Sequence, residues 1–165
     1  MTIRDATPDD ADAIWAIFRA VVAAGDAFPF PDDFTREQAL GYWFAPGTHV
    51  RVAEADGRVV GSYTVRPNQP GRAAHLANGA YLVDPAVRGG GVGRALGDDS
   101  VRECRRLGYR GMQFNLVVAT NEPAVRVWTA VGFRIIGTVP GAFHHATLGY
   151  VDAHVMYRSL LDDPA

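Results

Sequence analysis

The sequence predicts a single α+β (α/β mixed-sheet) domain over residues 1–165, with one mixed β-sheet carrying helices on its faces. Three observations predict this fold class. Apolar residues recur at helical spacing in some segments, while others alternate or run continuously as strands do. These segments follow the order β-α-α-β-β-β-α-β-α-β-β, which combines hairpins with strand–helix–strand units. A chain of 165 residues with 48% hydrophobic and 21% charged residues fits one domain with a buried core.

The first half of the chain is expected to form a strand, two helices and a hairpin. Thr7 caps the first helix, Pro8 occupies its first position, and Gly25 ends it. A Thr-x-x-Gln capping box opens the second helix, and the prolines between the two helices exclude regular helix there. Asp56-Gly57 is a two-residue hairpin turn. The expected elements are the strand 2–6, the helices 7–25 and 35–44, and the strands 49–55 and 58–66.

The second half is expected to alternate strands and helices before a final pair of strands. Gly108 and Gly132 end the two helices, because glycine adopts the left-handed conformation without strain. Pro85 ends a strand, since proline cannot donate to a ladder. The segment GAFHHATLGY, 141–150, is expected to be a loop. The expected elements are the strand 75–83, the helix 96–107, the strand 111–118, the helix 123–131, and the strands 133–139 and 151–158.

Composition excludes several classes of function. All 16 basic residues are arginine, so no phosphate-binding or Schiff-base lysine exists. A net charge of -2 argues against a nucleic-acid partner. One cysteine and five histidines offer no zinc-binding spacing, so no metal is expected. The sequence shows no long apolar run and no leader pattern, which predicts no membrane partner and a cytoplasmic location.

The richest local signal is the glycine segment within residues 83–96, which joins a strand to a helix. Its glycines let a ligand approach the backbone, and free amides at a helix N-terminus bind anions. Arg88 and Arg94 flank these amides, so the segment predicts a pyrophosphate site. A dinucleotide G-x-G-x-x-G fingerprint fails, because Arg94 or Leu96 stands at the third glycine position. The plain alternative is a glycine-rich turn that binds nothing.

Two motifs resemble those of the Gcn5-related N-acetyltransferases (GNAT). Arg88-Gly89-Gly90-Gly91-Val92-Gly93 matches Arg/Gln-x-x-Gly-x-Gly/Ala in that family. Asn121, Ala124, Trp128 and Gly132-Phe133 resemble Asn-x-x-Ala-x-x-x-Tyr-x-x-x-Gly-Phe. The resemblance covers nearly the whole chain. It implies a GNAT-like fold with six or seven mostly antiparallel strands, of which the fourth and fifth splay apart, and about four helices. It also implies an N-acetyltransferase with acetyl-CoA as the acetyl donor.

The same resemblance assigns the donor site. Backbone groups of Tyr81 to Val83 would bind the pantetheine arm as an added strand, and an amide near Leu82 or Val83 would hold the thioester oxygen. Asn121 would reach the pantetheine or the sulfur. The indole of Trp128 stands where many members carry an acidic tyrosine; it cannot be a general acid, and packing is its alternative role. The expected cofactor-binding residues are Tyr81, Leu82, Val83, Arg88, Gly89, Gly90, Gly91, Val92, Gly93, Arg94, Asn121, Ala124 and Trp128.

A narrower resemblance concerns the acceptor. Asn78-Gly79-Ala80, Phe114-Asn115-Leu116-Val117 and Asn121 are similar to the pattern of the fungal acetyltransferase that acts on azetidine-2-carboxylate and other proline analogues. This implies that Asn78 binds substrate and that Asn115 and Asn121 support substrate and thioester. Satisfied buried amides are the alternative. The strand 111–118 has no glutamate base, so a ribosomal-protein acceptor is less expected.

The remaining acceptor groups are weaker candidates. Phe28 and Phe30 are expected to form an apolar wall, and His145, with His75 and His144, is a titratable group that could take a proton.

The leading hypothesis is acetylation of a small-molecule amine or amino acid, which predicts a closed pocket. A protein or peptide acceptor predicts an open groove, and a non-catalytic acyl-CoA sensor is the alternative of a different class. Exposed sheet edges predict a homodimer.

Overall fold

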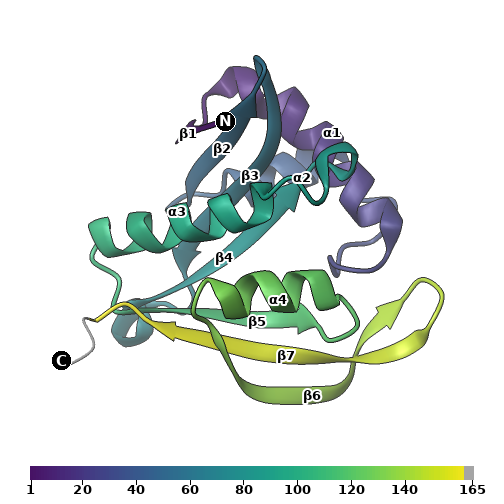
Figure 1. The fold of residues 1–165 in the computed structure, drawn as a ribbon, viewed down its shortest axis with the longest axis vertical. Coiled ribbons are helices and arrows are strands. Elements are labelled where there is room, and N and C mark those ends of the chain that lie inside the picture. Colours follow the sequence, from purple (N-terminus) through teal and green to yellow (C-terminus); the bar gives the residue numbers. More distant parts are fainter. Residues whose placement is uncertain (162–165) are drawn as a thin grey trace.

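The computed structural model describes residues 1–161 as one seven-stranded sheet with helices on both faces (Figure 1). The order across the sheet is β1-β2-β3-β4-β5-β7-β6, and neighbours pair antiparallel except β4 and β5. The strands are β1 (Thr2–Asp5), β2 (His49–Ala55), β3 (Arg58–Pro67), β4 (Leu76–Val83), β5 (Gly111–Val118), β6 (Arg134–His145) and β7 (Gly149–Ser159). The helices are α1 (Ala11–Ala24), α2 (Arg36–Trp43), α3 (Val92–Arg106) and α4 (Glu122–Ala130). The expected fold class and element order are confirmed.

The sheet separates two apolar cores. Phe18 of α1 and Trp43 of α2 pack with Leu82 on one face, and Leu96 of α3 packs with Phe114 and the α4 end on the other. Successive residues of a strand point to opposite faces, so β4 contributes to both cores. Helices α1 and α3 therefore contact β3 and β4 from opposite faces, while α4 lies beside α3 and over β5 (Figure 1).

The fourth and fifth strands separate soon after they meet. The parallel pairing of β4 and β5 contains only Leu76 with Gly111 and Ala77 with Met112. Beyond these pairs the strands diverge, as the resemblance implied. A gap in the middle of a sheet leaves unpaired backbone groups on both sides, and a bound ligand can satisfy them.

Two boundaries differ from the sequence prediction. The helix α3 begins at Val92 instead of residue 96, because Gly91 adopts a left-handed conformation with φ of 78° and serves as the N-cap. The predicted loop 141–150 is mostly a hairpin, so His144 and His145 belong to β6. Cross-strand pairing explains the hairpin, because the rings of His144 and Tyr150 lie opposite one another at 4.8 Å.

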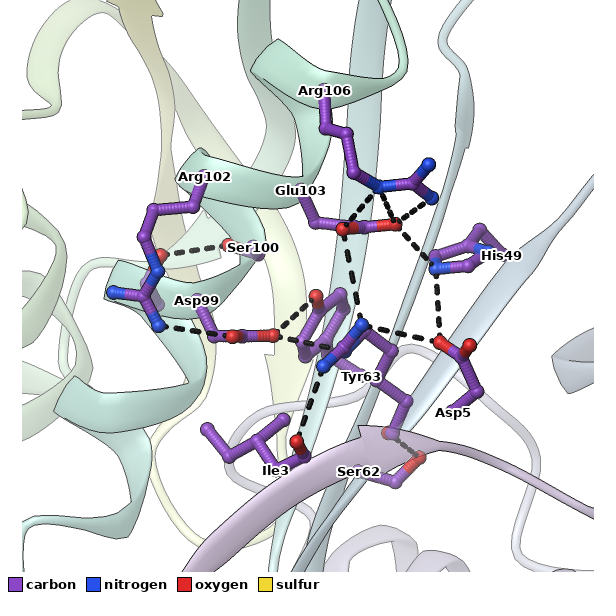
Figure 2. A network of polar contacts seen from close by, with 12 residues as sticks. Ile3, Asp5, His49, Ser62, Tyr63, Asp99, Ser100, Arg102, Glu103 and Arg106 are labelled. Carbon is purple, nitrogen blue, oxygen red and sulfur yellow. Dashed lines mark hydrogen bonds and ion pairs between the residues drawn. The ribbon is translucent and has the colours of Figure 1, made fainter.

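A polar network fixes α3 to the sheet (Figure 2). Asp99 accepts a hydrogen bond of 2.8 Å from the hydroxyl of Tyr63 and lies 3.0 Å from Arg51. One turn later, Glu103 pairs with Arg106 and lies 2.8 Å from His49. Burial and the neighbouring Asp99 carboxylate raise the pKa of Tyr63, so its hydroxyl stays a donor. The network holds the helix whose first turn meets the glycine segment.

Candidate active site

The gap between β4 and β5 exposes the backbone of alternate β4 residues. In an antiparallel pair, residues alternate between those that exchange hydrogen bonds with the neighbour and those that turn away from it. The amide of Asp84 donates to the carbonyl of Val60 over 2.9 Å, and the register of β3 with β4 is regular. Leu82 therefore bonds to β3, whereas Tyr81 and Val83 turn their backbone groups into the gap. Of the two amides considered for the thioester oxygen, the register favours Val83.

The glycine segment offers free backbone amides beside an unpaired arginine. Gly89 and Gly91 have φ of 86° and 78°. A Cβ atom on either would meet nothing within 4 Å, so a ligand can reach the backbone. The first-turn amides of α3 have no acceptor within the helix. Arg88 is exposed and has no ion-pair partner in the described part of the chain, whereas Arg94 pairs with Asp98 at 2.7 Å.

A cavity of about 280 Å³ opens where β4 and β5 separate. It brings together many of the residues predicted for the donor and acceptor sites. They are Phe28, Phe30, Asn78, Tyr81, Asn115, Asn121, Ala124 and Trp128. Leu82, Val83, His145 and the glycine segment are not part of its lining. The backbone of Val83 and the anion-binding amides therefore follow on from the cavity along β4.

Asn78 and Asn115 differ in how many hydrogen bonds their side chains already make. The side chain of Asn78 lines the cavity, is half-buried and makes no side-chain hydrogen bond among the described residues. Asn115 is exposed and engaged at both ends, since it donates to Asn68 over 2.7 Å and accepts from Gln113 over 3.0 Å. Asn78 is thus the free amide at the cavity, and Asn115 belongs to a polar chain at its edge.

The third asparagine has a structural role as well. Asn121 is the N-cap of α4, and its side-chain oxygen accepts from the amide of Ala124 over 3.2 Å. Its amide nitrogen has no partner among the described residues, and the residue lines the cavity. One end of the side chain therefore stabilises the helix, while the other can donate to a ligand.

Trp128 is part of an aromatic cluster behind the cavity. Its ring centroid lies 4.5 Å from that of Tyr81 and 4.9 Å from that of Phe114. The hydroxyl of Tyr81 lies 2.7 Å from that of Ser100 on α3, and burial raises the pKa of Tyr81. Neither the indole of Trp128 nor the phenol of Tyr81 can therefore supply a proton at neutral pH.

Aromatic rings from the segment between α1 and α2 form one wall of the cavity. The rings of Phe28 and Phe30 stack at 5.7 Å, and Phe30 meets Tyr42 edge-on at 4.9 Å. The sequence pattern did not indicate Tyr42 or its neighbour Arg66, whose guanidinium lies 4.4 Å from the Tyr42 ring centroid. Arg66 is opposite Asn78 in the β3–β4 register, so both side chains share one face. The pairing register of β3 with β4 is the signal that could have predicted Arg66.

The turn between β6 and β7 reaches the end of α1. The amide of Ala146 donates to the carbonyl of Gly25 over 2.9 Å. A Cβ atom on Gly25 would lie only 2.6 Å from that of Ala146, which shows how closely the two segments approach. The groove between the first two helices and the final hairpin is therefore bridged.

The histidines are poorly placed as bases. Nδ1 of His145 accepts from the amide of Thr147 over 3.1 Å, so the neutral ring carries its proton on Nε2. His144 is exposed and packs on Tyr150, and His75 lies outside the cavity with Nδ1 3.1 Å from a backbone carbonyl.

A carboxylate near the cavity was also missed. Oδ1 of Asp26 is buried and has no hydrogen-bond partner among the described residues; Asp26 does not itself line the cavity, but the next residue, Ala27, does. A buried carboxylate oxygen without a donor is costly, so a ligand amine or a water molecule is its natural partner.

Comparison with known proteins identifies the family. Residues 13–133 match the model of the acetyltransferase (GNAT) family. The chain is a GNAT acetyltransferase. It is 30% identical over 151 residues to the N-acetyltransferase aca1 of Schizosaccharomyces pombe, covering 81% of this chain and 72% of that one. It is 34% identical over 132 residues to the L-amino acid N-acetyltransferase AaaT of Escherichia coli, covering 79% and 78%.

Solved structures agree with this assignment. A Gcn5-related N-acetyltransferase from Kribbella flavida has a TM-score of 0.91 with 46% identity, covering 96% of each chain. The acetyltransferase yncA of Salmonella typhimurium, solved with its cofactor acetyl-CoA, has a TM-score of 0.87 with 25% identity, covering 100% of this chain and 96% of that one. The GNAT enzyme described here uses acetyl-CoA.

The residues of this chain fit that donor. The open amides of the glycine segment and Arg88 suit a pyrophosphate, and the free backbone of Tyr81 and Val83 suits an extended amide-bearing arm. No group of three metal-ligating side chains lies together in residues 1–161. No helix in that part of the chain is long and apolar enough to cross a membrane.

Proposed function

We propose that this GNAT enzyme acetylates the amine of a small amino acid. The observation that carries the proposal is the bridge between Gly25 and Ala146, because it joins the end of α1 to the β6–β7 turn, between which a peptide acceptor would have to lie. The cavity of about 280 Å³ behind it is near the lower end of the size range for small-molecule sites. The Escherichia coli relative, named for L-amino acids, supports the same substrate class.

Arg66 supports a carboxylate on the acceptor. Its guanidinium stacks on the cavity-lining Tyr42 and has no ion-pair partner among the described residues. A planar guanidinium binds a carboxylate through two parallel hydrogen bonds. Asn78, on the same face, adds a free amide. Asn78 in the cavity lining and Arg66 on the ring of the cavity-lining Tyr42 would together suit the carboxylate of an α-amino or cyclic imino acid.

The reaction follows from the placement of these groups. The donor supplies an electrophilic thioester carbon. The acceptor nitrogen attacks this carbon, a C–N bond forms, the C–S bond breaks, and the thiolate leaves. The amide of Val83 faces the gap and would stabilise the charge that develops on the thioester oxygen. The buried oxygen of Asp26 would accept a hydrogen bond from the amine and direct its proton toward water.

The location and the oligomeric state of the enzyme are also part of the proposal. We propose that it is a cytoplasmic homodimer that joins through β6. This strand ends the sheet and exposes Ile135, Ile136 and Val139, which are 45%, 53% and 50% exposed. An apolar edge of this kind favours pairing with a second copy.

A thiol-release assay tests the proposed reaction. Purified enzyme and acetyl-CoA are incubated with L-amino acids, azetidine-2-carboxylate, the matching amino amides and a short peptide. We expect turnover of free amino acids and imino acids, and little of the amides or the peptide. Turnover of the peptide alone would overturn the proposal, and donor binding without turnover of any amine would favour a sensor. The protein's own thiol does not disturb the assay, because burial raises the pKa of Cys104 to about 12.

A substitution at Asp26 tests the proton route. We expect Asp26→Asn to lower kcat for amino acids about tenfold or more, since a positioned base contributes at least that much, while KM for acetyl-CoA is unchanged. Asp32→Asn is the control, because Asp32 belongs to the same segment but is exposed and does not line the cavity. An unchanged kcat in Asp26→Asn would remove Asp26 from the mechanism and leave the substrate class standing.

A further inference from the structure

A second cavity, of about 520 Å³, lies at the other end of α3 from the glycine segment. Three elements build it. Arg105 comes from the last turn of α3, Arg134 is the first residue of β6, and Arg158 lies near the end of β7. In Figure 1 these ends meet on the left of the molecule, whereas the glycine segment joins the right-hand end of α3. Tyr157 and Ser159 add hydroxyl groups to the lining.

Backbone contacts hold two of the three guanidinium groups in place. Arg158 donates to the carbonyl of Val131, and Nε of Arg105 donates to the carbonyl of Leu160 over 3.3 Å. Gly132 makes room for Arg158, since a Cβ atom there would lie 3.2 Å from the guanidinium carbon. These arginines are therefore positioned by the fold.

The cluster has no acidic partner in the part of the chain that the structure describes. Within residues 1–161, no carboxylate lies within ion-pair distance of Arg105, Arg134 or Arg158, although other arginines of the chain are paired. Asp98, the acidic group that acts on Arg158, is held by Arg94 at 2.7 Å. Burial and the charge of Arg105 lower the pKa of Arg158, which is what an unneutralised cluster produces.

We propose that this cavity is a second ligand site, which binds the phosphate group of a small molecule apart from the acetyl-CoA site. Guanidinium groups from three segments surround a dianion better than a single carboxylate, because each fork supplies parallel hydrogen bonds to tetrahedral oxygens. The volume exceeds what inorganic phosphate fills, so a phosphate monoester fits the cavity. Bound there, it would tie α3, β6 and β7 together.

Calorimetric titration of the full chain tests the site. The probes are inorganic phosphate and ribose 5-phosphate, at ionic strength matched with chloride, with the enzyme saturated by coenzyme A. We expect both probes to bind, with a raised Tm. Tighter binding of the sugar phosphate indicates a metabolite, and equal binding indicates free phosphate.

Substitutions of the cavity arginines test whether the probes bind in this cavity. Arg134→Gln and Arg105→Gln should each weaken it about tenfold, the value of one charge-assisted hydrogen bond. Arg134 is exposed, and its side chain makes no hydrogen bond or ion pair within residues 1–161, so its loss should spare the fold. Arg19→Gln is the charge control and should bind normally, because Arg19 on α1 is exposed and has no ion-pair partner among the described residues. A parallel titration without coenzyme A completes the design: binding seen only in its absence, or lost in Arg88→Gln, belongs to the acetyl-CoA site and overturns the proposal. Failure to bind either probe, or binding indifferent to both cavity variants, overturns it as well.

Discussion

The amide of Ala146 donates to the carbonyl of Gly25 over 2.9 Å, which joins the β6–β7 turn to the end of α1. Gly25 adopts a left-handed conformation with φ of 62°, and its α-carbon faces Ala146 directly. Only glycine meets both conditions, because a side chain would be strained and would also clash. This contact holds the β6–β7 turn against the end of α1, next to the segment whose Phe28 and Phe30 line the cavity.

Replacing Gly25 should therefore separate the hairpin from α1. We expect Gly25→Ala to lower the free energy of unfolding by more than the ~1–2 kcal/mol that a left-handed conformation costs alanine. KM for the amine should rise about fivefold, the value of one lost hydrogen bond, with KM for acetyl-CoA unchanged. Gly47→Ala is the matched control, because Gly47 has φ of 79° and no atom within 4 Å of its Cβ position. Equal effects in the two variants would show that the bridge has no role in acceptor binding.

Arg66 should discriminate between charged and neutral acceptors. We expect Arg66→Gln to raise KM for a free amino acid about tenfold or more, because a charge-assisted pair to the carboxylate is lost. KM for the matching amino amide should stay the same. Steady-state kinetics with both acceptors measure this split. A parallel rise for acid and amide would mean that Arg66 only supports the Tyr42 ring, on which it stacks at 4.4 Å.

The sequence predicted the fold well because most of its signals are local. Capping residues, turn glycines and apolar periodicity placed every strand and helix in the correct order. The hairpin at Asp56-Gly57 is confirmed by positive φ at both residues, 51° and 71°. The start of α3 and the extent of β6 were wrong, because Gly91 acts as a helix cap and cross-strand pairs extend the hairpin. Those two features depend on neighbours that local patterns do not reveal.

The site was predicted in part, for the same reason. The motif residues Asn121 and Trp128 do line the cavity, since each motif lies within one strand–helix unit. Arg66 and Asp26 were missed, because their importance comes from what lies opposite them in the fold. The choice of Val83 over Leu82 also needed the register, which a single strand sequence does not define.

Asn121 allows its structural and ligand roles to be separated. Asn121→Asp keeps the oxygen that accepts from the amide of Ala124, so the N-cap and the melting temperature should be preserved. It loses the amide donor, and we expect kcat/KM to fall about tenfold or more. Asn121→Ala should lose both, with ~1 kcal/mol of stability lost as well. Thermal unfolding together with kinetics decides the matter, and full activity in Asn121→Asp would assign the residue to capping alone.

The salt bridge between Arg4 and Asp10 should set the acid limit of stability. Hydrogen bonds from Arg4, 2.8 Å away, lower the pKa of the buried Asp10 carboxyl to about 2. Because the folded pKa lies below the unfolded value, this contribution is fully present above about pH 4 and disappears as the pH falls toward 2. With Arg4 partly exposed, we expect the bridge to contribute about 1–2 kcal/mol. Asp10→Asn should lose this amount at pH 7 and flatten the decline between pH 4 and 2 in urea unfolding. Asp9→Asn, exposed and unpaired, should follow the parent curve. An unaltered acid limb in Asp10→Asn would place the acid-sensitive group elsewhere.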